Sequence, residues 1–438
     1  IYKKLGIYEL LIARSLYSGQ QIDKVGVSTA SFDHFYLPRL HRKGLVAPNV
    51  TDMTREEQSA GGMVIEPKAG LFKNVAVFDF KSLYPSIIRT FSIDPLARLL
   101  AAQAPSSELV NTPGSIAFAR KEAILPEFLK ELGDKRTNAK NNGNEPLSQA
   151  IKILMNSFYG VMGSPRSRFY HADLPTAITT AGHWILNQSI DYFDNLGLKV
   201  LYGDTDSLFV QLEGAWLEGD KTRELAKNLN HFLAKIIKDE FDCDSCLEVE
   251  YEKLYDQIFF GAARSSAAKI SERGSEQGAK KRYVGYADRT MSFIGMEYVR
   301  SDWTGLAKDF QFELFQRLFE GEPLEIFIKE EIKKLESGLY DHKLVYSKRL
   351  SKKLSEYTKS APPHIKAALQ LPVEKQKRLR SIEYVMTMQG PKPLALNKDQ
   401  PDYRHYIEKQ IRPVAQTVLL TQGLSFDEIH VGNQLNLF

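Results

Sequence analysis

The stretch Val-Ala-Val-Phe-Asp-Phe at residues 75–80, followed by Lys-Ser-Leu-Tyr-Pro-Ser at 81–86, decides how the chain is interpreted. Its apolar, β-branched and aromatic residues predict a buried strand that carries Asp79 near its end. A carboxylate in such a place loses hydration free energy unless a cation or hydrogen-bond donors compensate. Taken alone, Asp79 would be interpreted as an ordinary strand-end cap.

Two further carboxylates stand in a predicted hairpin turn. Residues 198–212 read as strand, tight turn and strand, and the turn contains Asp204 and Asp206. Such an Asp-rich turn, taken alone, favours an ordinary structural turn. Together with Asp79, however, carboxylates from separate strands form a hard-oxygen site suited to Mg²⁺. Two such ions about 3.5–4 Å apart can assist an in-line phosphoryl displacement.

Two predicted helices, about 125–141 and 146–163, carry a second group of polar residues. They are separated by the turn signal Asn-Asn-Gly-Asn-Glu-Pro, and Pro146 suits the first turn of the second helix. Helical spacing places several of these residues on shared faces: Lys152, Asn156, Tyr159 and Gly160 on one helix, and Arg136 and Lys140 on the other. Cations on facing helices would clamp a triphosphate. The alternative is a solvated amphipathic helix pair.

The remaining pattern mixes helices and strands. Helices are expected at 5–17 and 220–240, a linker or turn at 50–62, a connection at 102–118, β-rich stretches at 247–260 and 281–299, and a mostly helical, basic segment from Gly305 onward. Because helices are inserted between strands without a regular βα repeat, the fold class is predicted to be α+β.

Charge is unevenly distributed along the 438 residues. The net charge is only +4, but residues 343–380 hold eleven Lys or Arg and two acids, Glu356 and Glu374. A basic block on an otherwise acidic chain is typical of a protein that binds phosphate backbones. The alternative is a solvated surface.

Composition excludes several other classes. The 43% hydrophobic content excludes a wholly disordered chain, and no apolar run approaches the ~18–20 residues of a membrane span. Two cysteines cannot form a disulfide framework. The Cys243-x-x-Cys246 pair lacks a partner pair for zinc, so reduced thiols are favoured.

Four motifs in order resemble those of the family B DNA polymerases. They are Asp-Phe-Lys-Ser-Leu-Tyr-Pro-Ser (79–86), Lys-Ile-Leu-Met-Asn-Ser-Phe-Tyr-Gly (152–160), Tyr-Gly-Asp-Thr-Asp-Ser (202–207) and Lys-Lys-Arg-Tyr (280–283). Segments 70–91, 144–163 and 344–357 look closest to a bacterial branch of the family. The resemblance covers nearly the whole chain.

The resemblance implies a right-hand polymerase fold. It would have an antiparallel β palm, helical-hairpin fingers and a mostly helical thumb. The implied parts are an N-terminal segment at 1–62, palm at 63–100 and 164–300, fingers at 101–163, and thumb with a C-terminal tail at 301–438.

The resemblance also implies roles at the acidic site. Asp79 and Asp206 would bind two Mg²⁺ ions (with Mn²⁺ as an alternative), helped by the Phe80 carbonyl, and Asp204 is a weaker candidate. Ser82 and Leu83 would offer backbone N–H groups to the triphosphate, and Tyr84 would exclude a 2′-hydroxyl. Arg136, Lys140, Lys152 and Asn156 would hold the triphosphate, with Lys152 also catalytic, and Tyr159 and Gly160 would contact the nascent base pair.

Primer–template DNA would be held by other segments. The residues implied are Gly61 and Gly62 for the template, Lys280, Lys281, Arg282 and Tyr283 for the primer-side duplex, and Lys348, Arg349, Lys352 and Lys353 in the basic block. The run before residues 382–385 looks shorter than in relatives, which puts local thumb contacts in question.

The last five residues resemble the short peptide by which bacterial polymerases bind the ring-shaped sliding clamp. Its contact residues would be Gln434, Leu435, Leu437 and Phe438. The alternative is that Leu437 and Phe438 fold back onto the thumb. Family members of this type carry an N-terminal exonuclease, of which we find no motif here. The start at Ile1 therefore indicates a fragment, or a polymerase whose exonuclease is a separate domain or subunit.

The implied function is DNA-templated primer extension with deoxynucleotides, releasing pyrophosphate, in DNA repair or replication restart. The implied location is the bacterial cytoplasm, at the nucleoid. Two alternatives remain open: an inactive polymerase-derived scaffold that binds DNA or the clamp, and a protein-primed replicase of the same family.

Overall fold

The computed structural model describes residues 6–52, 64–65, 67–262, 278–357 and 361–431. The chain divides into two compact units. Unit 1 comprises residues 1–65 and 76–253, and unit 2 comprises residues 66–75 and 254–438. Within the described ranges, no helix combines the length and the apolar character that a membrane crossing requires.

Unit 1 contains part of a β-sheet. The strands of this sheet that lie at least partly in unit 1 follow the order β1 (Val64–Ile65), β5 (Lys199–Asp204), β6 (Ser207–Gln211), β2 (Gly70–Phe80) and β7 (Val249–Ala262). Strands β2 and β7 each begin in one unit and end in the other. The centre of β2 is buried from Val75 to Phe78, as its apolar run predicts, and Phe78 packs on Phe193 with 4.9 Å between ring centroids.

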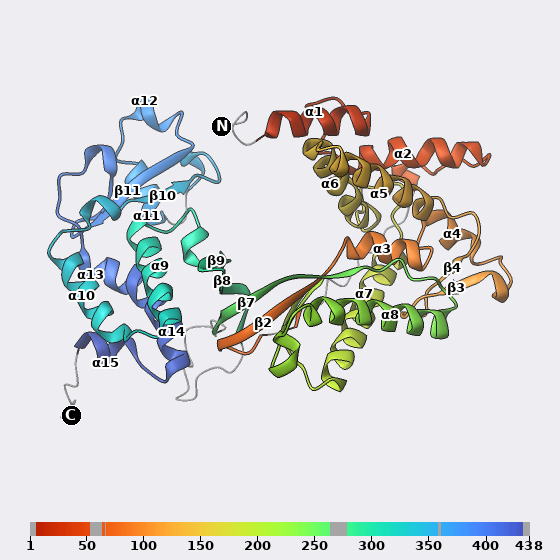
Figure 1. Ribbon diagram of the computed structural model, residues 1–438. Helices are drawn as coiled ribbons and strands as arrows, with labels where there is room; N and C mark the ends of the chain where they lie inside the picture. The colour runs from red at the N-terminus through yellow and green to blue at the C-terminus, as the bar shows by residue number, and fades with distance from the viewer. Residues whose placement is uncertain (1–5, 53–63, 66, 263–277, 358–360, 432–438) are drawn as a thin grey trace. The chain divides into compact units, whose positions relative to one another are not determined.

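Helices complete unit 1. They are α1 (Ile7–Ser18), α2 (Ser28–Arg42), α3 (Leu83–Thr90), α4 (Pro95–Leu100), α5 (Leu125–Asn141), α6 (Glu145–Met162), α7 (Asp173–Asn195) and α8 (Lys221–Phe241). The predicted pair at 125–141 and 146–163 is confirmed as α5 and α6, which lie side by side (Figure 1). Asn144 caps α6 by accepting from the Leu147 N–H at 3.2 Å, and Pro146 occupies the first turn.

Unit 2 combines strands and helices around one apolar core. Its elements are the ends of β2 and β7, β8 (Gly278–Ala287), β9 (Thr290–Ile294), α9 (Gly305–Glu320), α10 (Leu324–Glu336), β10 (Tyr346–Arg349), α11 (Pro363–Ala368), α12 (Val373–Gln376), β11 (Ser381–Thr387), β12 (Gly390–Pro393), α13 (Tyr403–Tyr406), α14 (Arg412–Leu419) and α15 (Phe426–Val431). Strands β7, β8 and β9 are antiparallel neighbours. The core includes Phe259, Phe315 and Phe327 from three different elements.

Two predictions need correction, and three helices were missed. The segment after Gly305 is not simply helical, because β10, β11 and β12 form an antiparallel sheet within it. The connection at 102–118 contains a short hairpin of β3 (Leu109–Asn111) and β4 (Ala117–Ala119). Helices α2, α4 and α7 were not predicted. The fold class itself, α+β with antiparallel strands, is confirmed.

Candidate functional site

The end of β2 is joined directly to the β5–β6 turn. The backbone N–H of Phe80 donates to the carbonyl of Asp206 at 2.8 Å. The turn itself is tight, since Asp204 pairs with Ser207 and Thr205 adopts a φ of 62°. A β-branched residue rarely adopts this backbone conformation, so the surrounding sheet must hold the turn in place. Two carboxylates that are 127 positions apart in sequence, Asp79 and Asp206, are thereby brought to one edge of the sheet.

The electrostatics of Asp79 reflect this neighbourhood. Burial, together with the charges of Asp206, Glu252 and Glu250, raises the pKa of Asp79 to about 7, while the charge of Lys152 opposes the rise. Carboxylates that repel each other in this way are stabilised in their ionised form by a bound cation. The donor set therefore fits a hard divalent cation.

Asp204 and Asp206 differ in exposure. Asp204 is half-buried and accepts from the Thr205 hydroxyl at 3.2 Å, whereas Asp206 is exposed. Around no point in the described ranges do three or more His, Cys, Asp or Glu side chains gather in a metal-binding arrangement. Mg²⁺ ordinarily uses one or two carboxylates and takes its other ligands from substrate phosphates and water, so two carboxylates suffice as a protein contribution.

Helix α3 begins immediately after this edge. Ser82 precedes the helix with a left-handed φ of 51°, and its side chain does not cap it. The buried Leu83 is the first helical residue. The first-turn N–H groups of α3 therefore begin three or four residues after Asp79, where an anion would be attracted.

A cleft of about 690 Å³ opens beside Asp79 and is lined by charged groups of both signs. Its lining includes the predicted residues Asp79, Ser82, Arg136, Lys140 and Lys152. Cations from α5 and α6 thus face a carboxylate at the end of β2. This is the arrangement that a metal-bound polyphosphate requires.

Two residues that the sequence analysis assigned to the site contact each other but do not line the cleft. The rings of Tyr84 and Tyr159 lie 4.6 Å apart between centroids at an angle of 45°. Burial, with contributions from Tyr159 and Asp206, raises the pKa of Tyr84 to about 12, so its hydroxyl stays protonated at neutral pH. Asn156 and Gly160 are exposed on the face of α6 that also carries Lys152, but neither lines the cleft.

Several site residues were missed by the sequence analysis. The cleft is also lined by Lys81, Arg89, Lys130, Glu248 and Glu250. A signal for the acids was present, since Glu248, Glu250 and Glu252 alternate along one strand face. No local pattern distinguishes Arg89 or Lys130 from ordinary surface cations.

The Lys280–Tyr283 motif lies on β8 in unit 2. Lys280 and Lys281 are exposed. Arg282 instead forms an ion pair of 2.6 Å with Glu297, whose side chain is only 1% exposed. Burial alone would raise the pKa of Glu297, but the Arg282 charge and the hydrogen bond from Gln311 outweigh it and lower that pKa. The Arg282 guanidinium is therefore already paired within the protein.

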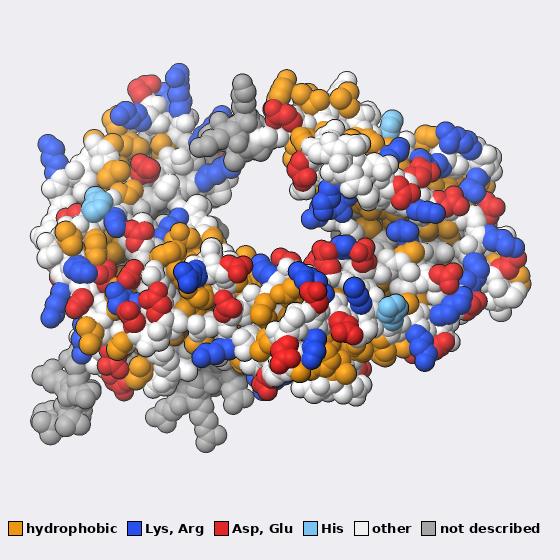
Figure 2. Space-filling view, viewed as in Figure 1, with side chains coloured by type: hydrophobic (Ala, Val, Ile, Leu, Met, Phe, Trp, Pro, Cys, Tyr) orange, Lys and Arg blue, Asp and Glu red, His pale blue; other side chains and the backbone are white. Residues whose placement is uncertain are grey.

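The basic block, residues 343–380, includes β10 and ends just before β11. Arg349, Lys352 and Lys353 are exposed, while Lys348 is paired with Asp302 at 3.2 Å. On the face drawn in Figure 2, basic side chains are spread over the part of unit 2 that carries β10 and β11. The predicted residues Gly61, Gly62, Gln434, Leu435, Leu437 and Phe438 lie outside the described residues.

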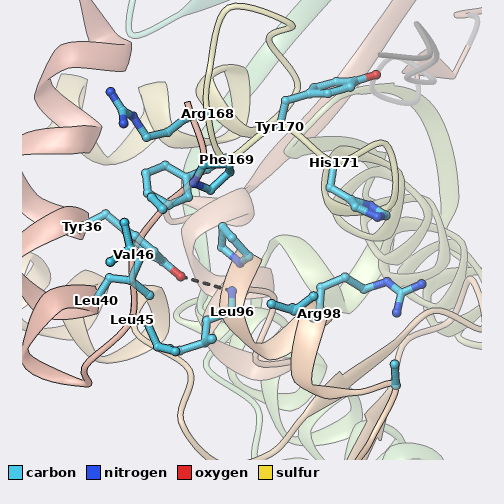
Figure 3. Close-up of a pocket in the computed structure, with 15 residues that line it drawn as sticks. Tyr36, Leu40, Leu45, Val46, Leu96, Arg98, Arg168, Phe169, Tyr170 and His171 are labelled. Atoms are coloured by element: carbon cyan, nitrogen blue, oxygen red, sulfur yellow. Dashed lines mark hydrogen bonds between the residues drawn. The ribbon is translucent and has the colours of Figure 1, made fainter. Parts of the chain in front are cut away.

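A second pocket of unit 1, about 390 Å³, has a different character. Its lining is mostly apolar, from the end of α2, from α4 and from residues 168–171. The Tyr36 hydroxyl accepts from the backbone N–H of Leu96 at 3.2 Å (Figure 3), and Arg168 pairs with Asp33 at 2.9 Å. Because these polar groups already have partners, the pocket is not a candidate phosphate site.

The two cysteines are free thiols. Cys243 is buried, and burial raises the pKa of its thiol. Cys246 is one of the residues that line the charged cleft. Neither takes part in a metal cluster in the ranges that the structure describes.

Comparison with known proteins gives consistent results. The sequence profile of DNA polymerase family B matches residues 28–422. DNA polymerase II of Escherichia coli K12 is 40% identical over 455 aligned positions, which cover 100% of this chain and 56% of the relative. DNA polymerase 2 of Aeropyrum pernix is 28% identical, covering 95% and 51%.

A solved structure is also similar. The family B DNA polymerase of Pyrobaculum calidifontis matches with a TM-score of 0.67 and 26% identity, over 95% of this chain and 54% of that one. The chain thus spans about half the length of the relatives it matches.

Proposed function

Since the chain belongs to DNA polymerase family B, we propose that it extends the 3′-hydroxyl of a DNA primer with deoxynucleotides on a DNA template. The observation that carries this proposal is that Asp79, next to the residue that bonds Asp206, lines a cleft together with Arg136, Lys140 and Lys152. Its role would be in DNA repair or replication restart at the bacterial nucleoid. The proposed parts are those of a right hand: palm at 63–100 and 164–300, fingers at 101–163 and thumb at 301–438, after an N-terminal segment at 1–62.

Asp79 and Asp206, with the Phe80 carbonyl and at most a minor part for Asp204, would hold two Mg²⁺ ions, or Mn²⁺ in their place. When bound, such ions lower the pKa of the attacking hydroxyl and neutralise charge on the attacking and leaving oxygens. The chain's own residues position the substrate. Arg136, Lys140, Lys152 and Asn156 would hold the triphosphate from one side, and the α3 N–H groups at Ser82 and Leu83 would hold it from the other.

Selection of the nucleotide would depend on shape. Template pairing chooses the base, so Tyr159 and Gly160 need only contact a pair of correct geometry. Lys280, Lys281 and Tyr283 would contact the primer-side duplex, with Gly61 and Gly62 on the template. Arg282 would support them mainly through its ion pair with Glu297.

Primer extension tests the proposal. The 438-residue chain, a primed DNA template, the four deoxynucleotides and Mg²⁺ should yield extended primers, and omission of the template should yield none. A chain that binds primed DNA but adds no nucleotide would identify a DNA-binding scaffold instead. Extension only from a protein primer would identify a protein-primed replicase.

Tyr84→Ala should admit ribonucleotides. The Tyr84 ring packs on Tyr159 beside the start of α3, where it would lie under the sugar of the bound nucleotide. Loss of the ring should lower discrimination against a 2′-hydroxyl by at least about tenfold, equivalent to ~1.4 kcal/mol. Single-nucleotide kinetics give the ratio of kcat/KM for the two sugars. Tyr84→Phe is the matched control and should keep the wild-type ratio, and an unchanged ratio in Tyr84→Ala would place the gate elsewhere.

The basic block is proposed to bind duplex DNA without reading its sequence. Replacing Arg349, Lys352, Lys353 and Lys366 by Gln should reduce the log–log salt slope of DNA binding by about 0.9 for each lost phosphate contact. Lys348 is left in place because Asp302 already pairs with it. As a control, the same change is made at Lys221, Arg223, Lys227 and Lys235 on α8. If the wild type and the four-residue variant show the same salt dependence of DNA binding, the basic block is a solvated surface that makes no phosphate contacts.

The C-terminal residues Gln434, Leu435, Leu437 and Phe438 are proposed to bind a sliding clamp. A short apolar peptide binds weakly, but attachment to the same DNA raises its effective concentration. Deletion of 434–438 should abolish stimulation by a loaded clamp and leave distributive extension intact. Full stimulation of the truncated chain, or a lower Tm, would contradict this role. Proofreading would come from an exonuclease domain or subunit outside this sequence.

A further inference from the structure

Lys81 lines the same cleft as Asp79 and is paired with two further acidic residues, Glu248 and Glu250. It follows Asp79 by two residues, and its ammonium nitrogen lies 2.6 Å from a Glu248 carboxylate oxygen and 2.9 Å from one of Glu250. Its backbone N–H also donates to the Glu248 carbonyl at 2.8 Å. Both the backbone and the side chain of Lys81 are therefore fixed to the start of β7.

The acidic pair lies in the same cleft as Asp79. Lys81, Glu248 and Glu250 all line the cleft, and the side chains of Glu248 and Glu250 are 62% and 46% exposed. The charge of Glu250 also acts on Asp79. A divalent cation that enters the cleft thus meets Asp79 and, separately, the Glu248–Glu250 pair.

Carboxylate oxygens that share one ammonium group can share a divalent cation instead. Oxygens from two carboxylates, with water completing the shell, are an ordinary ligand set for Mg²⁺ or Mn²⁺. Without the ammonium, two negative charges would remain close together, which favours uptake of such an ion. The energy of an exposed ion pair is small, so stability alone gives little reason for Lys81 to hold both carboxylates.

We propose that Lys81 acts as a built-in cation that occupies the Glu248–Glu250 pair and so reserves divalent ions for Asp79 and Asp206. Lys81 is then a positioning residue that sets where ions bind in the cleft. This inference rests on the proposed function, because it assumes that Asp79 and Asp206 are the productive ion site.

The test counts ions directly. The full chain is titrated with Mn²⁺ without DNA or nucleotide, and bound Mn²⁺ is measured by electron paramagnetic resonance. Lys81→Ala should bind about one additional Mn²⁺ per chain, because the freed carboxylates supply a hard-oxygen site. Lys81→Arg retains a cation and should match wild type.

Two further variants assign the additional ion. Lys81→Ala combined with Glu248→Gln and Glu250→Gln should return to the wild-type count. Lys81→Ala combined with Asp79→Asn and Asp206→Asn should still bind it. An unchanged count in Lys81→Ala, or an additional ion that persists without the two glutamates, would overturn the proposal.

This experiment is independent of the polymerase assay. No nucleotide is added, so an absence of primer extension by the wild-type chain would leave the Mn²⁺ count unaffected. Conversely, a failed ion count would leave the extension result untouched. Losing this exposed ion-pair network should lower the free energy of unfolding only slightly. Lys81→Ala should therefore remain folded, and a thermal melt verifies this.

Discussion

Asp206→Asn, and separately Asp79→Asn, should leave the fold intact and reduce primer extension by at least about 10³-fold. Each substitution removes a charge that would hold an ion worth several kcal/mol of transition-state stabilisation, and each ~1.4 kcal/mol is a factor of ten in rate. The amide keeps the shape of the side chain, and Asp206 is exposed, so little packing is lost. Single-turnover extension and a circular-dichroism melt on the same samples measure both effects.

The control for these variants is Asp239→Asn, which changes an exposed carboxylate on α8. It should extend primers at the wild-type rate. Asp204→Asn should have a smaller effect than Asp206→Asn, because Asp204 is half-buried whereas Asp206 is exposed. Near-normal extension by a folded Asp79→Asn or Asp206→Asn chain would refute the assignment of the acidic site.

Asp94→Ala should destabilise unit 1 by at least about 3 kcal/mol. The fully buried Asp94 carboxylate accepts from the Tyr36 hydroxyl and from the backbone N–H groups of Ala97, Ile124 and Leu125, at 2.8–3.2 Å. Each buried donor left without an acceptor costs about 1–3 kcal/mol. Burial raises the pKa of this carboxyl, and the four donors oppose that rise. Urea unfolding measures the loss.

The same substitution should weaken nucleotide binding, because Asp94 holds the start of α5, which carries Arg136 and Lys140. A raised KM for the nucleotide is the expected kinetic sign. Tyr36→Phe removes one of the four donors to Asp94 and the acceptor of the Leu96 N–H, so it should cost less than Asp94→Ala, about 1–2 kcal/mol. If Asp94→Ala is no less stable than Tyr36→Phe, the carboxylate is not the centre of this network.

The sequence predicted those helices and strands whose periodicity, turn residues and caps all lie within one short stretch of the chain. The α5–α6 pair, the β5–β6 hairpin and the buried centre of β2 each carry their own periodicity, turn residues or caps. The family was also visible, since its motifs are short strings. The sequence therefore determined the α+β class, the family and the identity of the candidate carboxylates.

Contacts between distant segments were decided only by the tertiary structure. Lys81 meets Glu248 across 167 positions, and nothing near either residue indicates the other. Strands β10 and β11 pair although residues 350–380 separate them, so neither has a hairpin signal. Arg282 matched a DNA-contact motif, yet it forms an ion pair with the buried Glu297. In each case the partner lies far away in the sequence and is reached only when the chain folds. For Arg282 and Glu297, the contact also compensates the cost of burying a carboxylate.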